Sequence, residues 1–201
     1  AALVAREKSW GVNRIITTPH VTQDTFENTP DIIEAAFARL QEAVKSNGTD
    51  IELLHSAEYR MDGFFNSERE KKHITPMPNN YLLVENSFVQ EAWNIDNLLF
   101  NLKMEGYKPI LAHPERYMYY FDKKSRYHQL HDSGTLFQIN LLSLAGNYGK
   151  GPKIMAEYLI EHDMVDFIGT DMHTERHADT IEKYLTTKEY RKIANRLADR
   201  I

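Results

Sequence analysis

The chain has 201 residues, 42% of them hydrophobic, which is long enough for one sizeable core, so we expect a single domain over residues 1–201. The formal net charge of −5 provides no basic field for nucleic acid, and no apolar run approaches the roughly 20 residues of a membrane-spanning helix. Cysteine is absent, which excludes disulfides, thiolate zinc sites and a cysteine nucleophile, and fits a reducing, cytoplasmic compartment.

The first ten residues are typical of a helix, and Gly11 is a plausible helix stop. This segment opens without a capping residue and without a preceding strand. We therefore expect that the chain lacks its natural beginning.

From Gly11 onwards, strand-like runs alternate with helical segments. Thr29, Pro30 and Asp31 predict a helix start, as N-cap, first-turn proline and dipole-favoured acid, and Asn47-Gly48 predicts its end. Strands are expected at Ile15-Ile16 and near 51–57, 81–85, 108–112, 135–139 and 165–169, and further helices near 63–72, 94–105, 122–132, 152–162 and from about 178 to the end. Six strands joined by helices indicate a parallel sheet.

Acidic or imidazole side chains stand where these apolar runs stop. They are His20, Glu58, Glu85, His113 and Asp171, with His173 two residues beyond Asp171. If the strands form an α/β barrel, these groups meet at the carboxyl end of the strands, where barrel enzymes keep their active sites. A barrel is preferred because such side chains end nearly every strand, whereas an open sheet would concentrate its site at one switch point in the strand order.

Three imidazoles and three carboxylates form a donor set that suits Mn²⁺, Fe²⁺ or Zn²⁺ rather than Ca²⁺. A site with two or more such ions clamps the attacking and leaving oxygens of a phosphoryl displacement. Arg116 lies three residues beyond His113, and Arg176 lies three beyond His173. Because a guanidinium binds phosphate oxygens in a fork, the combination points towards phosphoester hydrolysis.

Six short motifs follow one another along almost the whole chain. They are Thr18-Pro19-His20, Ala57-Glu58-Tyr59, Leu83-Val84-Glu85, Ala112-His113-Pro114-Glu115-Arg116-Tyr117, Gln138-Ile139-Asn140 and Thr170-Asp171-Met172-His173. In order and spacing they resemble the bacterial metal-dependent tyrosine phosphatases of capsule and exopolysaccharide synthesis, which belong to the polymerase-and-histidinol-phosphatase (PHP) superfamily.

The resemblance implies a distorted TIM-like (βα)7 barrel with a site of two or three metals, Mn²⁺ preferred and Fe or Zn as alternatives. It implies hydrolysis of phosphotyrosine in a protein substrate, the tyrosine-rich tail of a polysaccharide-synthesis kinase. Relatives of this type form rings or stay monomeric, so the resemblance leaves the oligomeric state open. Carried over by motif, the metal ligands are His20, Glu58, Glu85, His113, Asp171 and His173, with Glu58 bridging, and Arg116 binds phosphate. The family's second arginine usually stands farther beyond the Asp-x-His motif, so Arg176 is either its equivalent or a surface residue.

The family also opens with a strand carrying Asp-Ile-His-x-His, and residues 1–12 do not match it. We therefore expect six strands instead of seven, fewer bound metals, and weak or no activity from this polypeptide until that strand is restored.

Because cysteine is absent, the nucleophile expected from this resemblance is a metal-bound hydroxide, with Arg116 neutralising charge on the phosphoryl oxygens. Two alternatives stay open: a PHP-type phosphatase of a small phosphoester such as histidinol phosphate, and a scaffold that binds a kinase tail without turnover. Residues 117–121, an aromatic run, either form a wall for the substrate ring or pack beneath a loop.

Overall fold

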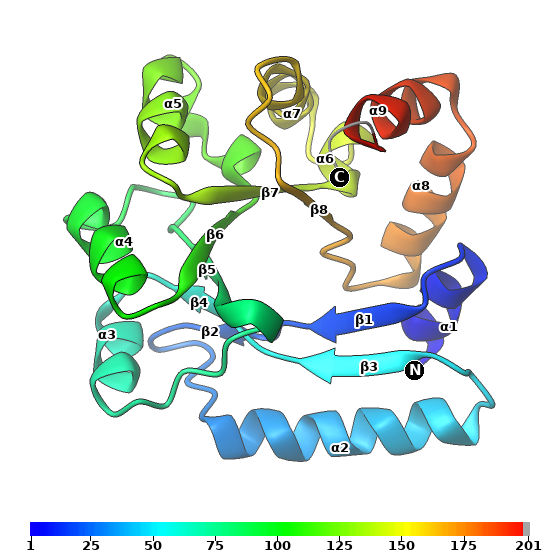
Figure 1. The fold of residues 1–201 in the computed structure, drawn as a ribbon. Helices are drawn as coiled ribbons and strands as arrows, with labels where there is room; N and C mark the ends of the chain where they lie inside the picture. The colour runs from blue at the N-terminus through cyan, green and yellow to red at the C-terminus, as the bar shows by residue number, and fades with distance from the viewer. Residues whose placement is uncertain (199–201) are drawn as a thin grey trace.

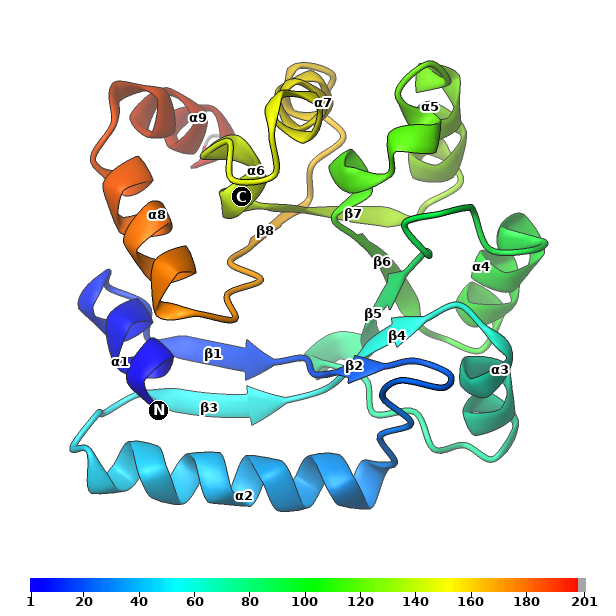
Figure 2. The same ribbon diagram turned by 180° about the vertical axis from the view of Figure 1, so that it is seen from behind.

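A computed structural model describes residues 1–198 as a curled, all-parallel sheet with helices on its outer side (Figures 1 and 2). Six strands form the main sheet in the order β2-β4-β5-β6-β7-β8, and β1 pairs with β3 beside it. The strands are β1 Arg14–Thr17, β2 His20–Val21, β3 Glu52–His55, β4 Glu58–Arg60, β5 Tyr81–Glu85, β6 Lys108–Ala112, β7 Leu136–Asn140 and β8 Phe167–Gly169.

The first two predicted strands, at Ile15-Ile16 and near 51–57, form β1 and β3. After an interruption at the same level, each is followed by a short strand beyond the predicted range, β2 and β4 respectively. The interruption at Thr18-Pro19 follows from proline, which has no backbone N–H for a ladder. The two breaks remain in register, because Ser56 N donates to Thr17 O at 2.9 Å and Glu58 N donates to Pro19 O at 3.0 Å. The two interruptions therefore lie side by side, and His20 is directly beside Glu58 in the ladder that follows them.

The helices follow the predicted order. They are α1 Ala2–Ser9, α2 Pro30–Ser46, α3 Gly63–Glu70, α4 Ile95–Met104, α5 Lys124–Asp132, α6 Leu141–Leu144, α7 Lys150–Glu161, α8 Glu175–Leu185 and α9 Lys188–Ala198, with 3-10 turns η1 Pro78–Asn80, η2 Pro114–Arg116 and η3 Met118–Tyr120. Gly11 ends the first helix region with a φ of 95°, which favours glycine. Thr29 occupies the N-cap position of α2, but its side chain makes no capping hydrogen bond there.

Within the described residues the sheet is a curled half-barrel, because no ladder joins β8 to β1 or β2. Helix α1 lies beside β1, at the side where β8 and β1 are not joined, and contacts α8 and α2 (Figure 1). Arg6 of α1 ties the two ends of the chain together through ion pairs with Glu175, Asp179 and Glu182 of α8. The main core fills the space between sheet and helices, with Leu82, Leu111 and Phe137 fully buried.

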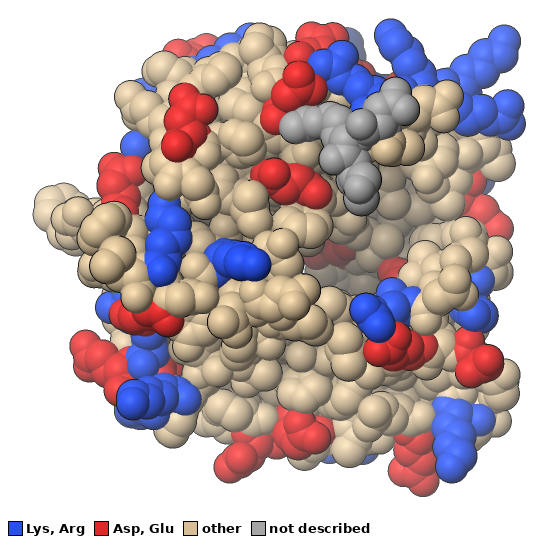
Figure 3. All heavy atoms as spheres, viewed as in Figure 1, with Lys and Arg blue, Asp and Glu red and all other residues tan. Residues whose placement is uncertain are grey.

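Basic and acidic side chains are interspersed over the face drawn in Figure 3. Of the helices in residues 1–198, none combines the length and the apolar character needed to cross a bilayer.

Helix α7 offers a matched test of the packing. Ile160 is 3% exposed in the core, whereas Ile154 on the same helix is 58% exposed. We expect Ile160→Ala to lower the free energy of unfolding by about 2–5 kcal/mol, because it opens a cavity in the core. Ile154→Ala should stay within about 0.5 kcal/mol of the wild type. Urea unfolding measures both changes, and equal losses would contradict this packing of α7.

Candidate metal centre

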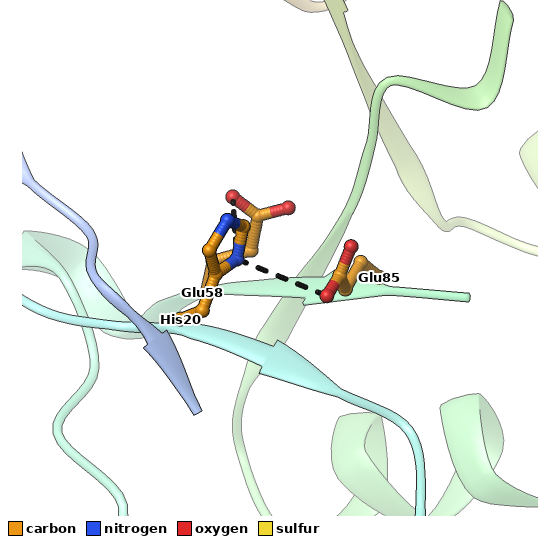
Figure 4. A group of neighbouring side chains, drawn as sticks. All are labelled: His20, Glu58 and Glu85. Carbon is orange, nitrogen blue, oxygen red and sulfur yellow. Dashed lines mark ion pairs between the residues drawn. The ribbon is translucent and has the colours of Figure 1, made fainter. Parts of the chain in front are cut away.

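Three side chains from neighbouring strands converge at one point. His20 opens β2, Glu58 opens β4 and Glu85 closes β5. His20 Nδ1 lies 3.9 Å from Glu58 Oε2 and 3.8 Å from Glu85 Oε1, and one ligand atom from each residue lies within 4.8 Å of the others. Figure 4 shows the imidazole facing both carboxylates.

The cluster has the properties of a cation site. Glu58 is 5% exposed and Glu85 is 1% exposed, and His20 Nδ1 and Glu85 Oε1 are buried without a hydrogen-bond partner. An ion pair with Arg60 Nη2 at 3.2 Å offsets part of the charge on Glu85 Oε1, but burying polar atoms without hydrogen bonds is costly. Two donors bound to one ion at about 2.1 Å each lie no more than about 4.2 Å apart, so the separations from His20 fit shared coordination better than hydrogen bonding. The residues present therefore fit a divalent metal.

His113 joins this cluster from β6. It directly follows the strand in a left-handed conformation, with a φ of 36°, and its Nε2 lies 2.9 Å from Glu58 Oε1 and 3.6 Å from Glu85 Oε2. Its Nδ1 is buried without a hydrogen-bond partner. The predicted ligands His20, Glu58, Glu85 and His113 are thus brought together.

The electrostatics of the cluster are those of crowded negative charge. Burial raises the pKa of Glu85, and the neighbouring charge of Glu58 raises it further. Burial is the largest single influence on Glu58 and opposes its charged form, but the hydrogen bond with His113 and the charges of His113, His20 and Arg116 together outweigh it and lower the pKa of Glu58. The pKa of His113 is raised because its interaction with Glu58 overcomes the effect of burial. A cation between the two carboxylates would relieve this repulsion.

Asp171 and His173 lie at the same cleft but outside the cluster. Asp171 Oδ2 accepts hydrogen bonds from Arg116 Nη1 at 3.0 Å and from Asn140 Nδ2 at 2.7 Å. The exposed ring of His173 stacks on His20, with 5.8 Å between the ring centroids. Their role as ligands stays a prediction.

Arg116 lies at the end of η2 with an aromatic ring on each of two neighbouring loops. Its Cζ is 4.6 Å from the ring centroid of Phe88 and 4.0 Å from that of Tyr148. A cleft of about 260 Å³ joins this guanidinium to the donor cluster, and its lining includes His20, Glu85, His113, Arg116, Asp171 and His173.

Arg176 lies apart from these residues. It is exposed on the first turn of α8 and does not line the cleft, whereas the adjacent His177 does. Its predicted contact with phosphate stays a prediction.

Several cleft residues escaped the sequence reasoning. Arg60, whose Nη2 is 3.2 Å from Glu85 Oε1, stands two residues after Glu58 on the same strand, and the period of two could have identified it. Asn140, which ends β7 and donates to Asp171, stands in one of the six motifs, but the sequence reasoning gave it no role. Phe88 and Tyr148 come from loops, where no periodic signal exists.

The aromatic run packs beneath a loop, the second of its two alternatives. Tyr117 and Tyr120 are buried, and neither lines the cleft. The Tyr117 hydroxyl donates to Ala112 O at 3.0 Å and accepts from Asn86 N at 2.9 Å. The aromatic wall of the cleft is instead supplied by Phe88, Tyr148 and Phe26.

Comparison with known proteins agrees with these motifs. The chain is 28% identical over 184 residues to the tyrosine-protein phosphatase YwqE of Bacillus subtilis (strain 168), covering 90% of this chain and 72% of that protein. It is 31% identical over 180 residues to the tyrosine-protein phosphatase CpsB of Streptococcus pneumoniae, covering 86% of this chain and 73% of that protein.

The fold is also that of solved relatives. Crystal structures of YwqE from Bacillus subtilis and CpsB from Streptococcus pneumoniae, described as unique metal-dependent tyrosine phosphatases, include a chain that matches with a TM-score of 0.80 and 24% identity. The match covers 96% of this chain and 82% of that chain. The model of the family described as "Capsular polysaccharide synthesis, CpsB/CapC" matches residues 1–201. The chain therefore belongs to the CpsB/CapC family of capsular polysaccharide synthesis proteins, which confirms the family predicted from its motifs.

Proposed function

We propose that this chain is a metal-dependent protein-tyrosine phosphatase. The observation that carries the proposal is one cleft whose lining includes His20, Glu85 and His113 of the donor cluster together with the guanidinium of Arg116. Relatives that bear the name tyrosine-protein phosphatase support it, because they align with 86–90% of the chain.

His20, Glu58, Glu85 and His113 would hold the metal, with Asp171 and His173 completing the site. Bound there, divalent cations lower the pKa of water and neutralise phosphoryl charge. We propose Mn²⁺ because the donors mix imidazole nitrogen with carboxylate oxygen, and Fe or Zn fit the same donors.

Arg116 would bind the phosphoryl oxygens. Its guanidinium already lies in the cleft, and Phe88 and Tyr148 hold its orientation. A phosphate group would replace Asp171 as the acceptor of its N–H groups, and this charge-assisted contact would neutralise the charge on the phosphoryl oxygens.

The proposed substrate is phosphotyrosine in a protein, and the tyrosine-rich tail of a polysaccharide-synthesis kinase is the candidate partner. The leaving group is the phenolate of tyrosine, whose phenol has a pKa of about 10. Its departure therefore depends less on protonation by a general acid than the departure of an alkyl alcohol does. Because the sequence lacks cysteine, we place the protein in a reducing, cytoplasmic compartment.

The metal centre can be tested with a matched pair of buried glutamates. Glu85→Gln removes a donor of the cluster, while Glu68→Gln changes a buried carboxylate that pairs with Lys71 and His73 elsewhere. We expect Glu85→Gln to lower Mn²⁺ affinity and p-nitrophenyl phosphate hydrolysis at least about 100-fold, because loss of a direct ligand costs no less than loss of a supporting group. Metal analysis after gel filtration and steady-state kinetics measure both effects, and normal metal content in Glu85→Gln would refute the assignment.

The phosphate contact can be tested at Arg116. Arg116→Lys keeps the charge but removes the fork, and we expect kcat/KM to fall about 10- to 100-fold with metal content unchanged. Arg69→Lys is the control, because Arg69 is similarly buried but pairs with Glu105. We expect Arg176→Lys to have a smaller effect than Arg116→Lys, and an equal loss would assign both arginines to phosphate binding.

Substrate choice separates the two phosphatase candidates. With added Mn²⁺, we expect hydrolysis of a phosphotyrosyl peptide to exceed that of a phosphoseryl peptide and of histidinol phosphate. Release of inorganic phosphate measures all three reactions. Preference for histidinol phosphate would overturn the protein-phosphatase proposal in favour of the small-substrate enzyme.

A further inference from the structure

The loop between β5 and α4, residues 86–94, is held in place from within. Asn86 is fully buried and uses its backbone and side chain as anchors. Its N donates to Tyr117 Oη at 2.9 Å, its Nδ2 donates to Tyr120 Oη at 3.3 Å, and its Oδ1 accepts from Ala92 N at 3.0 Å. One buried amide therefore fixes both ends of the loop.

A second anchor, the side chain of Glu91, also has its negative charge paired. Glu91 is the one charged residue in residues 86–94. Its Oε1 accepts from Tyr120 Oη at 2.5 Å and from Arg126 Nε at 2.6 Å, and Arg126 also pairs with Asp96 at the start of α4. The loop is therefore ordered, and its charge is already paired.

This ordered loop exposes apolar side chains. Phe88 is 41% exposed, Val89 is 83% exposed and Trp93 is 95% exposed. A partner that contacts an already ordered surface avoids the entropy cost of fixing a mobile loop. Tryptophan is also among the side chains that contribute most to the binding energy of protein interfaces.

The exposed surface is continuous with the cleft through Phe88. The ring of Phe88 stacks on His113 with 5.3 Å between centroids, lies 4.6 Å from Arg116 Cζ and lines the cleft. Val89 is the next residue and points its exposed surface to solvent. A polypeptide whose phosphotyrosine enters the cleft would pass this loop.

We propose that loop 86–94 is a docking surface for the substrate polypeptide, in which Val89 and Trp93 contact apolar residues beside the phosphotyrosine. This inference rests on the proposed phosphatase function and narrows its substrate class. Apolar flanks are favoured over charged ones because the loop's single carboxylate is paired with Arg126. A small phosphoester held in the cleft has no chain with which to reach Trp93.

Tryptophan fluorescence tests the contact without requiring turnover. The chain has two tryptophans, so Trp10→Phe leaves Trp93 as the single reporter. With Mn²⁺ present, we expect a phosphotyrosyl peptide with leucine flanks to shift Trp93 emission to shorter wavelength, whereas phenyl phosphate should leave it unchanged. A shift of the same size with phenyl phosphate, or none with the peptide, would overturn the proposal.

Kinetics of the double variant Val89→Ser/Trp93→Ala supply the second arm. We expect kcat/KM for the leucine-flanked peptide to fall at least about 10-fold, because a contacting tryptophan is among the few interface residues that carry most of the binding energy. We expect kcat/KM for phenyl phosphate to change less than about 2-fold. Phe100→Ala is the control, because Phe100 is an exposed aromatic on α4.

The possible failures are distinct. Equal losses on peptide and phenyl phosphate would mean that the loop supports the cleft instead of docking a chain. An emission shift that depends on protein concentration without peptide would assign the surface to a second copy. Absence of phosphate release from both substrates by the wild type would count against the proposed phosphatase, while the fluorescence result would still judge the docking surface.

Discussion

The register of three short strands determines the centre of this molecule. By pairing β2 with β4 and β4 with β5, it places His20 beside Glu58 and Arg60 beside Glu85. Two buried carboxylates, Glu58 and Glu85, are thereby brought to one end of the sheet. Adjacent buried negative charges are unfavourable unless they are paired. His113 and Arg60 offset part of this charge, yet His20 Nδ1 and Glu85 Oε1 remain without hydrogen bonds. A bound cation would supply the partner that these two atoms lack.

The same edge of the sheet also assembles an anion site. Arg116 is placed by the turn after β6, and Asp171, after β8, holds it from the other side of the cleft. Asn140 donates to the same oxygen of Asp171. Asn140 therefore holds the Asp171 carboxylate in place, and this carboxylate in turn holds Arg116. One cavity therefore contains metal-binding side chains and a guanidinium that can exchange Asp171 for phosphate. Phosphoryl transfer uses both, because a cation and a guanidinium together neutralise the charge on the phosphoryl group.

Much of this arrangement could be predicted from the sequence because it depends on local patterns. Apolar runs located the strands, and the polar residues ending them identified His20, Glu58, Glu85 and His113. The interruptions at Thr18-Pro19 and at Ser56-Ala57 were missed, since an apolar run does not reveal an interruption shared with a neighbouring strand. The predicted distorted barrel, expected to lack its first strand, is a curled half-barrel within residues 1–198, and its closure could not be judged from the sequence because closure depends on pairing between distant segments.

Loop residues were the least predictable part of the site. Phe88 and Tyr148 meet Arg116 from different loops, and their positions depend on tertiary anchors such as Asn86. The aromatic run 117–121, for which the sequence left two alternatives open, supports the loop carrying Phe88. Sequence therefore located the chemistry of the cleft more readily than its walls.

The central claim is that His20, Glu58 and Glu85 hold a cation beside Arg116. Anomalous scattering from a crystal of the chain grown with Mn²⁺ tests it most directly. We predict a manganese peak about 2.0–2.3 Å from His20 Nδ1 and from oxygens of Glu58 and Glu85, the range of metal–ligand distances for such donors. A cluster without a peak at saturating Mn²⁺, or with manganese bound only at other residues, would contradict the account.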